Sequence, residues 1–190
     1  MTGGYDKCDE GASCYRKYLD GDKSAFDNII NLYHDSLIYF IYGILHNTAD
    51  AEDVAADVFA DLIINKNRYG FRCSLKTYIF SVARHKAIDR FRREKHIYDG
   101  DFELATENIA DAEHLEETVI SGERSKLVRD AIKELSADYA EVLTLSYIHG
   151  LTGDEICNVT GKSKKQIANL TYRGKEALKN ILTRKGEGLL

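Results

Sequence analysis

Apolar residues recur at steps of three and four along most of this chain, the spacing that lines up side chains on one face of an α-helix. Between residues 24 and 45 these positions are Phe26, Ile29, Ile30, Tyr33, Leu37, Phe40, Ile41 and Ile44. Ser24 is placed to cap this helix, and the polar pair His46-Asn47 marks its end. The sequence has no proline and no alternating run bounded by hairpin turns. The pattern therefore predicts an all-α fold.

A second helix is predicted to begin at Asn47 or Thr48, since either residue can cap it. Its inner stripe is Ala51, Val54, Ala55, Val58 and Leu62. Four carboxylates step by three, four and four along the opposite face, namely Asp50, Asp53, Asp57 and Asp61. This row has three interpretations: a solvated surface, a docking surface for a basic partner, or a metal site. A metal site would lack the Glu-x-x-His partners of a helical two-metal centre.

The segment from Ser74 to Lys95 predicts a third helix, capped by Ser74. Its expected inward positions are Leu75, Tyr78, Ile79, Val82, Ala83 and Phe91. The remaining face is so basic that its side chains repel one another unless an anion is bound, and DNA phosphate is such an anion. The rings of Tyr69, Phe71 and Tyr78 have two interpretations: packing in the core, which is the more common role of such rings, or stacking on unpaired bases, which their position among these cations favours. Candidate DNA-contacting residues are Arg72, Lys76, Tyr78, Arg84, His85, Lys86, Asp89, Arg92 and Arg93.

Charge is distributed in blocks, although the whole chain carries a formal net charge of only −5. Residues 66–96 hold ten Lys and Arg against two acids, a net charge of +8. Residues 97–123 hold nine acids and no Lys or Arg, and residues 161–185 return to +7. An acidic segment poor in apolar residues buries too little apolar surface to offset the conformational entropy that it would lose on ordering. The blocks therefore indicate two helical lobes joined by an acidic linker, with one basic surface on each lobe.

The second lobe shows a helix-turn-helix pattern. Leu127, Val128, Ala131, Ile132 and Leu135 predict one apolar stripe, and Tyr139, Val142, Leu143 and Tyr147 predict the next. Two capping boxes follow, Thr152 to Glu155 and Ser163 to Gln166, separated by the turn Thr160-Gly161-Lys162. Gln and Asn can bond adenine edges and Arg can bond guanine, so the outer face of the last helix is a candidate reading surface. Its candidate DNA-contacting residues are Ser163, Lys164, Lys165, Gln166, Asn169, Tyr172 and Arg173.

Together, residues 50–95 and 132–182 resemble a bacterial RNA polymerase sigma factor of the extracytoplasmic-function (ECF) type. DAEDVAADVFADLI and the basic helix after it look like the sigma-2 domain of that family, and residues 132–182 look like its sigma-4 domain. The resemblance implies a flexible N-terminus at 1–20, a sigma-2-like domain at 21–97 and an acidic linker at 98–123. It further implies a sigma-4-like domain at 124–184 and a tail at 185–190.

The same resemblance implies a function. Asp50, Asp53, Asp57 and Asp61 would dock on the clamp helices of the largest polymerase subunit, and the second domain would contact the flap of the second subunit. The Ser74–Lys95 helix would read and melt the minus-ten element, and the last helix would read the minus-thirty-five element. An anti-sigma factor is a further partner that the resemblance leaves open. The chain departs from the family at Tyr78, where Trp is frequent, and at His85, where Asn is frequent.

Other classes are less well supported. A free-standing helix-turn-helix repressor or activator remains the alternative, and it would bind duplex DNA without polymerase. No phosphate-binding Gly loop, nucleophile elbow or zinc spacing is present, so we expect no enzyme activity, cofactor or metal. The polar N-terminal residues lack the apolar core of a signal peptide, and the apolar runs are too short to span a bilayer. A cytoplasmic protein without membrane insertion is expected.

Overall fold

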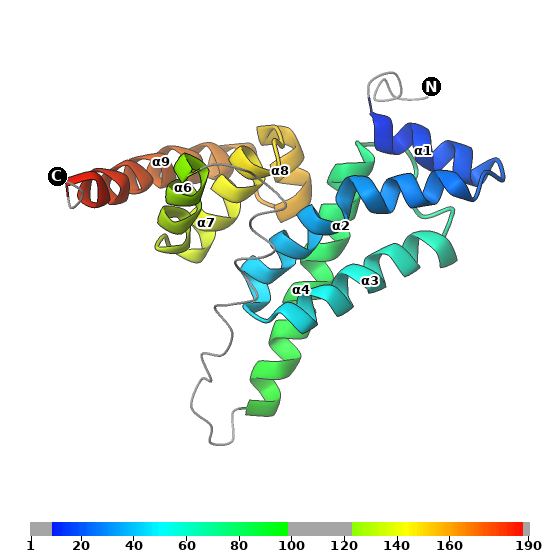
Figure 1. Ribbon diagram of the computed structural model, residues 1–190, viewed down its shortest axis with the longest axis horizontal. Helices are drawn as coiled ribbons and strands as arrows, with labels where there is room; N and C mark the ends of the chain where they lie inside the picture. Colours follow the sequence, from blue (N-terminus) through cyan, green and yellow to red (C-terminus); the bar gives the residue numbers. More distant parts are fainter. Residues whose placement is uncertain (1–8, 99–122, 188–190) are drawn as a thin grey trace. The chain divides into compact units, whose positions relative to one another are not determined.

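The computed structural model describes residues 9–98 and 123–187, and every element in these ranges is helical (Figure 1). The all-α prediction is therefore confirmed. The helices fall into two compact units, one up to α4 and the other from α6 onward. The acidic stretch predicted as a linker, 98–123, lies outside the described residues except at its two ends. No helix in the described ranges is both long enough and apolar enough to cross a membrane.

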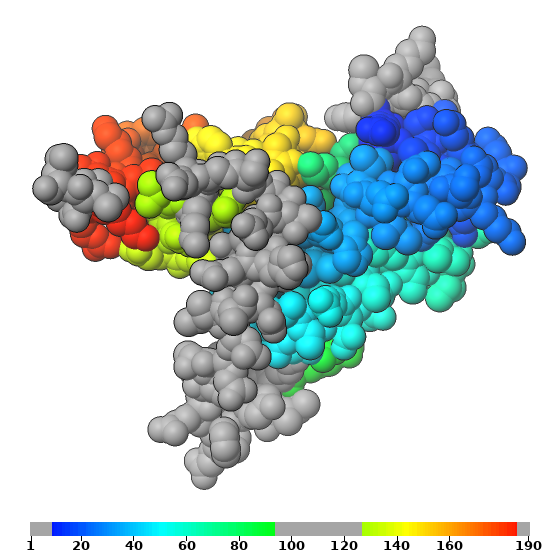
Figure 2. All heavy atoms as spheres, viewed as in Figure 1, coloured from blue at the N-terminus to red at the C-terminus, as the bar shows by residue number. Residues whose placement is uncertain are grey.

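The first unit is built around α2. Its helices are α1 (Glu10–Leu19), α2 (Ser24–Leu45), α3 (Thr48–Ile64) and α4 (Leu75–Tyr98). The surface that this unit presents in Figure 2 shows α2 lying between α1 and α3 and in contact with both. Helix α2 contacts the other three, and its Ile29, Leu37 and Ile41 are completely buried. Burying a side chain of this size stabilises the fold by roughly 1.5–3 kcal/mol. Because α2 contributes several such side chains and contacts the other three helices, it is the centre of this unit.

Helix α1 corrects the expectation that residues 1–20 form a flexible N-terminus. Residues 10–19 are helical, and the ring of Tyr15 is completely buried. The Tyr15 hydroxyl donates to the carbonyl oxygens of Leu62, at 2.9 Å, and Lys66, at 3.1 Å. Only three residues of α1 are buried. The inner face of this helix is therefore small but well packed, which is why its mostly polar sequence did not predict it. Residues 1–8 lie outside the described part of the chain.

The helix ends of the first unit follow the predicted pattern, except that Ser24 does not cap α2. Ser24 is the first residue of α2 rather than its cap, and the Asp22 carboxylate accepts from both the Ser24 backbone nitrogen and its hydroxyl. His46 ends α2 in the left-handed conformation, with φ of 55°. Asn47, not Thr48, caps α3, because its side-chain oxygen accepts from the backbone nitrogen of Asp50 at 3.1 Å.

Helix α4 completely buries three of the six positions predicted to face inward, Leu75, Ile79 and Ala83, and it buries others that were not predicted. Phe80 and Ala87, which the sequence pattern did not single out, are completely buried beside Leu75 and Ile79. Phe91 lies one turn beyond Ala87 on the same stripe, yet it is 46% exposed. Figure 1 shows the end of α4 extending past α2 and α3. Phe91 therefore lies on the apolar face of α4, but at a level where α2 and α3 no longer cover that face.

The second unit contains α6 (Glu123–Lys133), α7 (Ala137–Leu143), a π-helical turn η1 (Thr144–Ile148), α8 (Gly153–Thr160) and α9 (Lys164–Glu187). Its core is formed by Ala131, Ile132, Leu143 and Leu178. Leu127 and Tyr147 were expected inside but are 42% and 52% exposed. The wider π turn adds a residue to the helical repeat, which rotates Tyr147 outward and leaves Leu145 buried.

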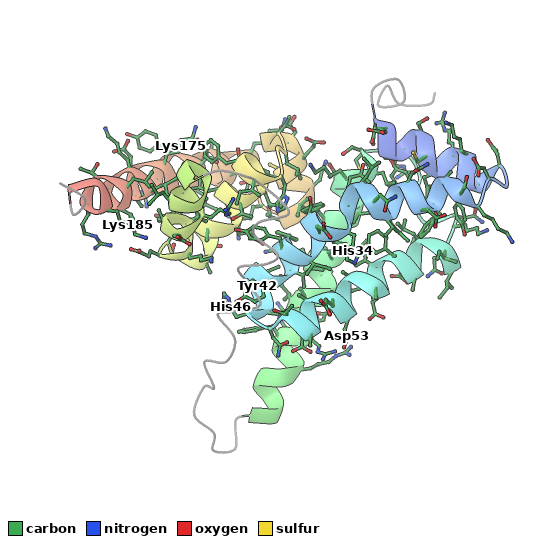
Figure 3. The ribbon with its side chains drawn as sticks, viewed as in Figure 1. His34, Tyr42, His46, Asp53, Lys175 and Lys185 are labelled. Atoms are coloured by element: carbon green, nitrogen blue, oxygen red, sulfur yellow. The ribbon has the colours of Figure 1, made fainter. Side chains whose placement is uncertain are left out.

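Helix α9 extends into the segment predicted as a tail. It continues to Glu187, so residue 185 does not begin an unstructured end. The Glu134 carboxylate forms ion pairs with the Arg184 guanidinium and with Lys185 Nζ, each at 2.7 Å. Figure 3 labels Lys185. The hydrogen bond from Lys185 lowers the pKa of the Glu134 carboxyl. This cluster holds the C-terminal end of α9 against the end of α6.

Candidate nucleic-acid interface

The basic face of α4 is largely open to solvent. His85, Asp89, Arg92 and Arg93 are exposed, as is Arg72 in the segment before the helix. Lys76, Tyr78, Arg84 and Lys86 are partly buried. The predicted residues thus share one helix and the loop that leads into it, and three of them, Arg72, Arg92 and Arg93, present exposed cationic groups of the kind that phosphate contacts require.

Two of the four predicted α3 carboxylates are neutralised within the unit. Asp50 accepts from the Arg90 guanidinium, and Asp61 lies 3.5 Å from Lys86 Nζ and 3.7 Å from Arg68. Asp53 and Asp57 are exposed, and Asp53 projects from α3 in Figure 3. The expectation of one continuous acidic row is therefore corrected: its two ends turn toward cations of α4 and the adjoining loop, and its middle faces outward.

The aromatic residues before α4 form an internal cluster. Tyr69 is 3% exposed, and its hydroxyl donates to the Cys73 carbonyl at 2.7 Å. Its ring centre lies 4.6 Å from that of Phe71 and 5.1 Å from that of Tyr78. Burial raises the pKa of the Tyr78 phenol. The suggestion that all three rings stack on bases is thus wrong for Tyr69, which is part of the core, whereas Phe71 and Tyr78 remain partly accessible.

Sequence reasoning missed the contribution of α1 to this loop. The Arg16 guanidinium lies 4.8 Å above the Phe71 ring, and Lys66 Nζ lies 4.7 Å above the ring of Tyr18. Phe71 also has a φ of 55°, a left-handed conformation that is costly for a bulky side chain. The paired residues are about 50 positions apart, so no local pattern could have revealed them.

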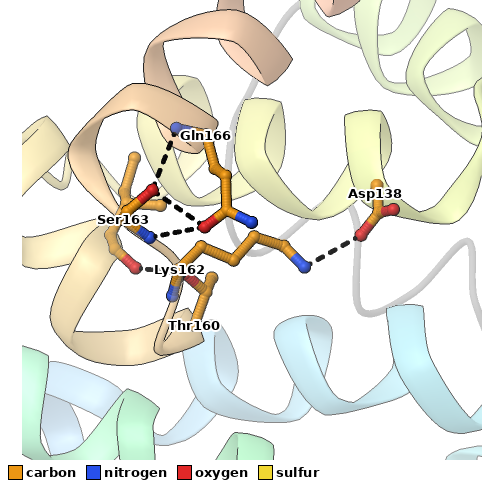
Figure 4. Close-up of polar contacts among 6 residues, drawn as sticks. Asp138, Thr160, Lys162, Ser163 and Gln166 are labelled. Carbon is orange, nitrogen blue, oxygen red and sulfur yellow. Dashed lines mark hydrogen bonds and ion pairs between the residues drawn. The ribbon is translucent and has the colours of Figure 1, made fainter.

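The second unit presents the predicted helix-turn-helix. The Thr152–Glu155 capping box begins α8, and Gly161 ends it with a φ of 71°. Figure 4 shows the second box, in which the Ser163 backbone nitrogen donates to Gln166 Oε1 at 2.8 Å. In the same view Lys162 reaches Asp138, at 3.1 Å, and so ties the turn to the start of α7. Both capping boxes and the turn are confirmed.

The outer face of α9 carries every residue proposed to read DNA, and all of them are exposed: Ser163, Lys164, Lys165, Gln166, Asn169, Tyr172 and Arg173. Three of these, Ser163, Lys164 and Gln166, already have partners. Gln166 Oε1 is occupied by the capping box, and Lys164 Nζ lies 2.8 Å from Asp154 on α8. Lys165, Asn169 and Arg173 therefore carry the polar groups best placed for direct contacts, and Tyr172 is 69% exposed.

A groove runs between the start of α8 and the outer face of α9. Its lining includes Gly153, Ala168, Thr171, Tyr172 and Lys175. Lys175 was not predicted as a site residue, and its Nζ lies 5.5 Å from the centre of the Tyr147 ring (Figure 3 labels Lys175). The only available signal was that residues 168, 172 and 175 share a helical face.

An exposed basic helix in one unit and a helix-turn-helix in the other define a DNA-binding transcription factor. Comparison with known proteins supports this class. Residues 29–97 match the Sigma-70 region 2 family, and residues 125–178 match Sigma-70, region 4. The chain is 31% identical to the ECF RNA polymerase sigma factor SigW of Bacillus subtilis over 144 residues, covering 72% of this chain and 77% of SigW. It is 26% identical to SigX of the same organism, covering 70% and 71%.

Solved structures show the same fold. CnrH, in a complex with the cytosolic domain of CnrY, matches with a TM-score of 0.64 and 17% identity, covering 93% of this chain and 99% of CnrH. RpoE of Bartonella quintana, in a complex with the anti-sigma factor NepR, matches with a TM-score of 0.62 and 20% identity, covering 83% and 96%. The chain belongs to the ECF family of RNA polymerase sigma factors. It is a sigma factor that directs promoter-specific transcription.

Proposed function

We propose that this sigma factor docks on core RNA polymerase through the exposed middle of α3, contacts the minus-ten element with α4 and contacts the minus-thirty-five element with α9. The observation that carries the proposal is the division of the α3 carboxylates. Asp50 and Asp61 are held by Arg90 and Lys86, whereas Asp53 and Asp57 face solvent. Solvent-facing carboxylates remain available for a basic partner such as the clamp helices of the largest polymerase subunit.

The C-terminal end of α3 also offers apolar contact area. Ile63 and Ile64 are 44% and 76% exposed, and Ile64 lies two turns after Asp57 on the same face of the helix. A surface that combines charges with exposed large apolar side chains is typical of a protein–protein interface, where the apolar part supplies affinity and the charges supply orientation. Ile64 therefore extends the proposed docking surface beyond the carboxylates that the sequence pattern singled out.

The proposed DNA contacts use both units. On α4 and the loop before it, the cations Arg72, Lys76, Arg84, Arg92 and Arg93 would contact phosphates, while Tyr78 would pack beside an unstacked base. On α9, Lys165, Asn169 and Arg173 would approach base edges in the major groove. Ser163 and Lys164, at the start of α9, would hold the adjacent phosphate backbone.

The proposal extends to further partners. The second unit would contact the flap of the second polymerase subunit, and an anti-sigma factor would compete with polymerase for the first unit. RpoE of Bartonella quintana was solved with such a factor bound, which supports this partner for the present chain. The role is that of an initiation factor without catalysis of its own. Bacterial polymerase and promoters lie in the cytoplasm, so we infer the same compartment for this protein.

Transcription in vitro tests the proposal, using sigma-free bacterial core polymerase and genomic fragments from the source organism. The full chain should give specific new transcripts, and the double variant Asp53→Lys/Asp57→Lys should bind core polymerase at least tenfold more weakly. The matched control Asp20→Lys/Asp27→Lys makes the same charge change on exposed residues outside α3 and should bind normally. Equal binding by both double variants would exclude the α3 surface.

Failure of transcription would favour the alternative function. If the chain gives no specific transcript yet binds particular fragments tightly by itself, it is a free-standing helix-turn-helix regulator. If it binds core polymerase no better than an unrelated acidic protein, the polymerase proposal is wrong.

A further inference from the structure

His85 differs chemically from the cations around it on α4. Its side chain is exposed, and Nδ1 lies 2.7 Å from the backbone carbonyl oxygen of Ser81, one turn earlier. A carbonyl oxygen can only accept a hydrogen bond, so the proton of this contact belongs to Nδ1. A neutral imidazole has one such proton, and its other nitrogen, Nε2, therefore carries a lone pair. The Ser81 contact thus fixes both the tautomer and the orientation of the ring.

The surrounding side chains are almost all hydrogen-bond donors. Arg84 and Lys86 flank His85 in the sequence, and Arg92 and Arg93 follow two turns later. Asp89 is the nearby acceptor, one turn beyond His85, and it lies 3.8 Å from Arg92. DNA phosphates offer only acceptors, so they suit the cations of this face but not Nε2. The groups of a duplex that donate in the major groove are the amino groups of adenine and cytosine.

We infer that His85 is a specificity-determining residue of this sigma factor: its Nε2 accepts a hydrogen bond from the amino group of adenine or cytosine at one duplex position of the minus-ten region. Guanine and thymine present carbonyl oxygens at the same place, which oppose the lone pair. The inference rests on the proposed function of α4. It goes further because it assigns a chemical class of base to one side chain of this chain.

A promoter library tests the inference. A promoter found in the transcription experiment is randomised across its minus-ten region and transcribed by polymerase carrying the wild-type chain or a variant. The wild type should prefer adenine or cytosine at one position by roughly fivefold, the effect of one hydrogen bond of about 1 kcal/mol. His85→Phe should abolish the preference at that position alone. His85→Asn, whose amide both donates and accepts, should transcribe all four bases there at similar levels.

Arg93→Ala is the matched control, because it removes an exposed cation from the same helix. It should lower transcription from every template by a similar factor and leave base preference unchanged. The inference is overturned if His85→Phe retains every preference of the wild type, or if the position that it affects prefers guanine or thymine.

The proposed function and the assignment of His85 can be disproved separately. A wild-type chain that yields no specific transcript overturns the proposed function, and the assignment of His85 with it. If specific transcripts form but the His85 variants keep the base preferences of the wild type, only the assignment of His85 is wrong and the sigma function stands.

Discussion

The Asp9 carboxylate accepts a hydrogen bond from the backbone nitrogen of Leu75 at 2.6 Å, although the two residues are 66 positions apart in the chain. Its other oxygen accepts from the backbone nitrogen of Ala12 at 3.3 Å. One side chain therefore caps α1 and also satisfies a donor at the first turn of α4. Both helix ends carry partial positive charge, so a carboxylate between them is favoured electrostatically as well.

Asp9→Ala should loosen both helix starts. The loss of a capping side chain typically costs about 1 kcal/mol, and here two ends are affected, so we expect about 1–2 kcal/mol. Hydrogen exchange measured by NMR should show faster exchange of the Ala12 and Leu75 amides in the variant. Asp20→Ala, an exposed aspartate at the other end of α1, should leave both amides protected. Unchanged protection of Leu75 in Asp9→Ala would show that this contact is dispensable.

Gly11→Ala should destabilise the packing of α1 on α2. A Cβ atom at Gly11 would lie 2.1 Å from the hydroxyl oxygen of Tyr33, whose ring is buried. Relieving such an overlap costs about 1–3 kcal/mol, more than the roughly 1 kcal/mol that alanine gains in helix propensity. Gly43→Ala is the control, because nothing lies within 4 Å of its Cβ position. Urea unfolding should show a loss of stability for the first variant and a gain for the second.

Tyr15 should make the first unit sensitive to alkaline pH. Burial, together with the neighbouring Tyr78 and Tyr18, raises the Tyr15 pKa from its ordinary value of 10.0 to about 12. The unfolded chain therefore releases the phenolic proton more readily than the folded chain does. The stabilising contribution of the neutral phenol is complete below pH 10 and is lost as pH rises from 10 toward 12.

A comparison with Tyr15→Phe isolates this effect. The variant lacks the hydroxyl that donates to Leu62 and Lys66, so it should be less stable than wild type at pH 8 by about 1–2 kcal/mol. That difference should shrink as the pH is raised above 10, as measured by denaturant unfolding. Tyr172→Phe, at a position that is 69% exposed, is the control and should match the stability of wild type at pH 8. A Tyr15→Phe difference that stays constant up to pH 11.5 would contradict the pKa assignment.

Gln166 and Asn169 should behave differently toward promoter DNA although they lie one turn apart. Gln166 Oε1 closes the capping box with Ser163, so Gln166→Ala should cost about 1 kcal/mol at the start of α9 and weaken all promoters alike. Asn169 is exposed, and its amide suits an adenine edge, so Asn169→Ala should change base preference at one minus-thirty-five position. Transcription from a library randomised in that element separates the two roles. A sequence-specific effect of Gln166→Ala would show that the amide leaves the cap to read a base.

The sequence predicted helices well wherever their ends carry local chemistry. Asn47, Thr152 and Ser163 each cap a helix with a partner three residues away, so the structure that they form is encoded within one turn. The α3 stripe and the outer face of α9 follow equally from periodicity, because each needs only one side of one helix to be apolar.

The predictions that were wrong share a different physical cause: each depends on contacts or geometry that a local stretch of sequence does not contain. Helix α1 is stabilised by contacts that Tyr15 and Asp9 make with residues about 50 and 66 positions away, which no local window contains. Tyr147 was misplaced because a π turn changes the helical repeat without a residue that signals it. Asp50 and Asp61 were placed on an open face because their partners on α4 and the adjoining loop become neighbours only after folding.

Helix α9 is a single rod of 24 residues, about 36 Å long at 1.5 Å per residue. The residues proposed to read DNA occupy its first ten positions, while its far end is paired with Glu134, the residue that follows α6. The helix is also held along its length, because Ile167 near its start is buried and Leu178 belongs to the core of the second unit. A helix held at its end and along its middle keeps its outer face in one orientation, so the side chains proposed to contact DNA are pre-organised within the second unit.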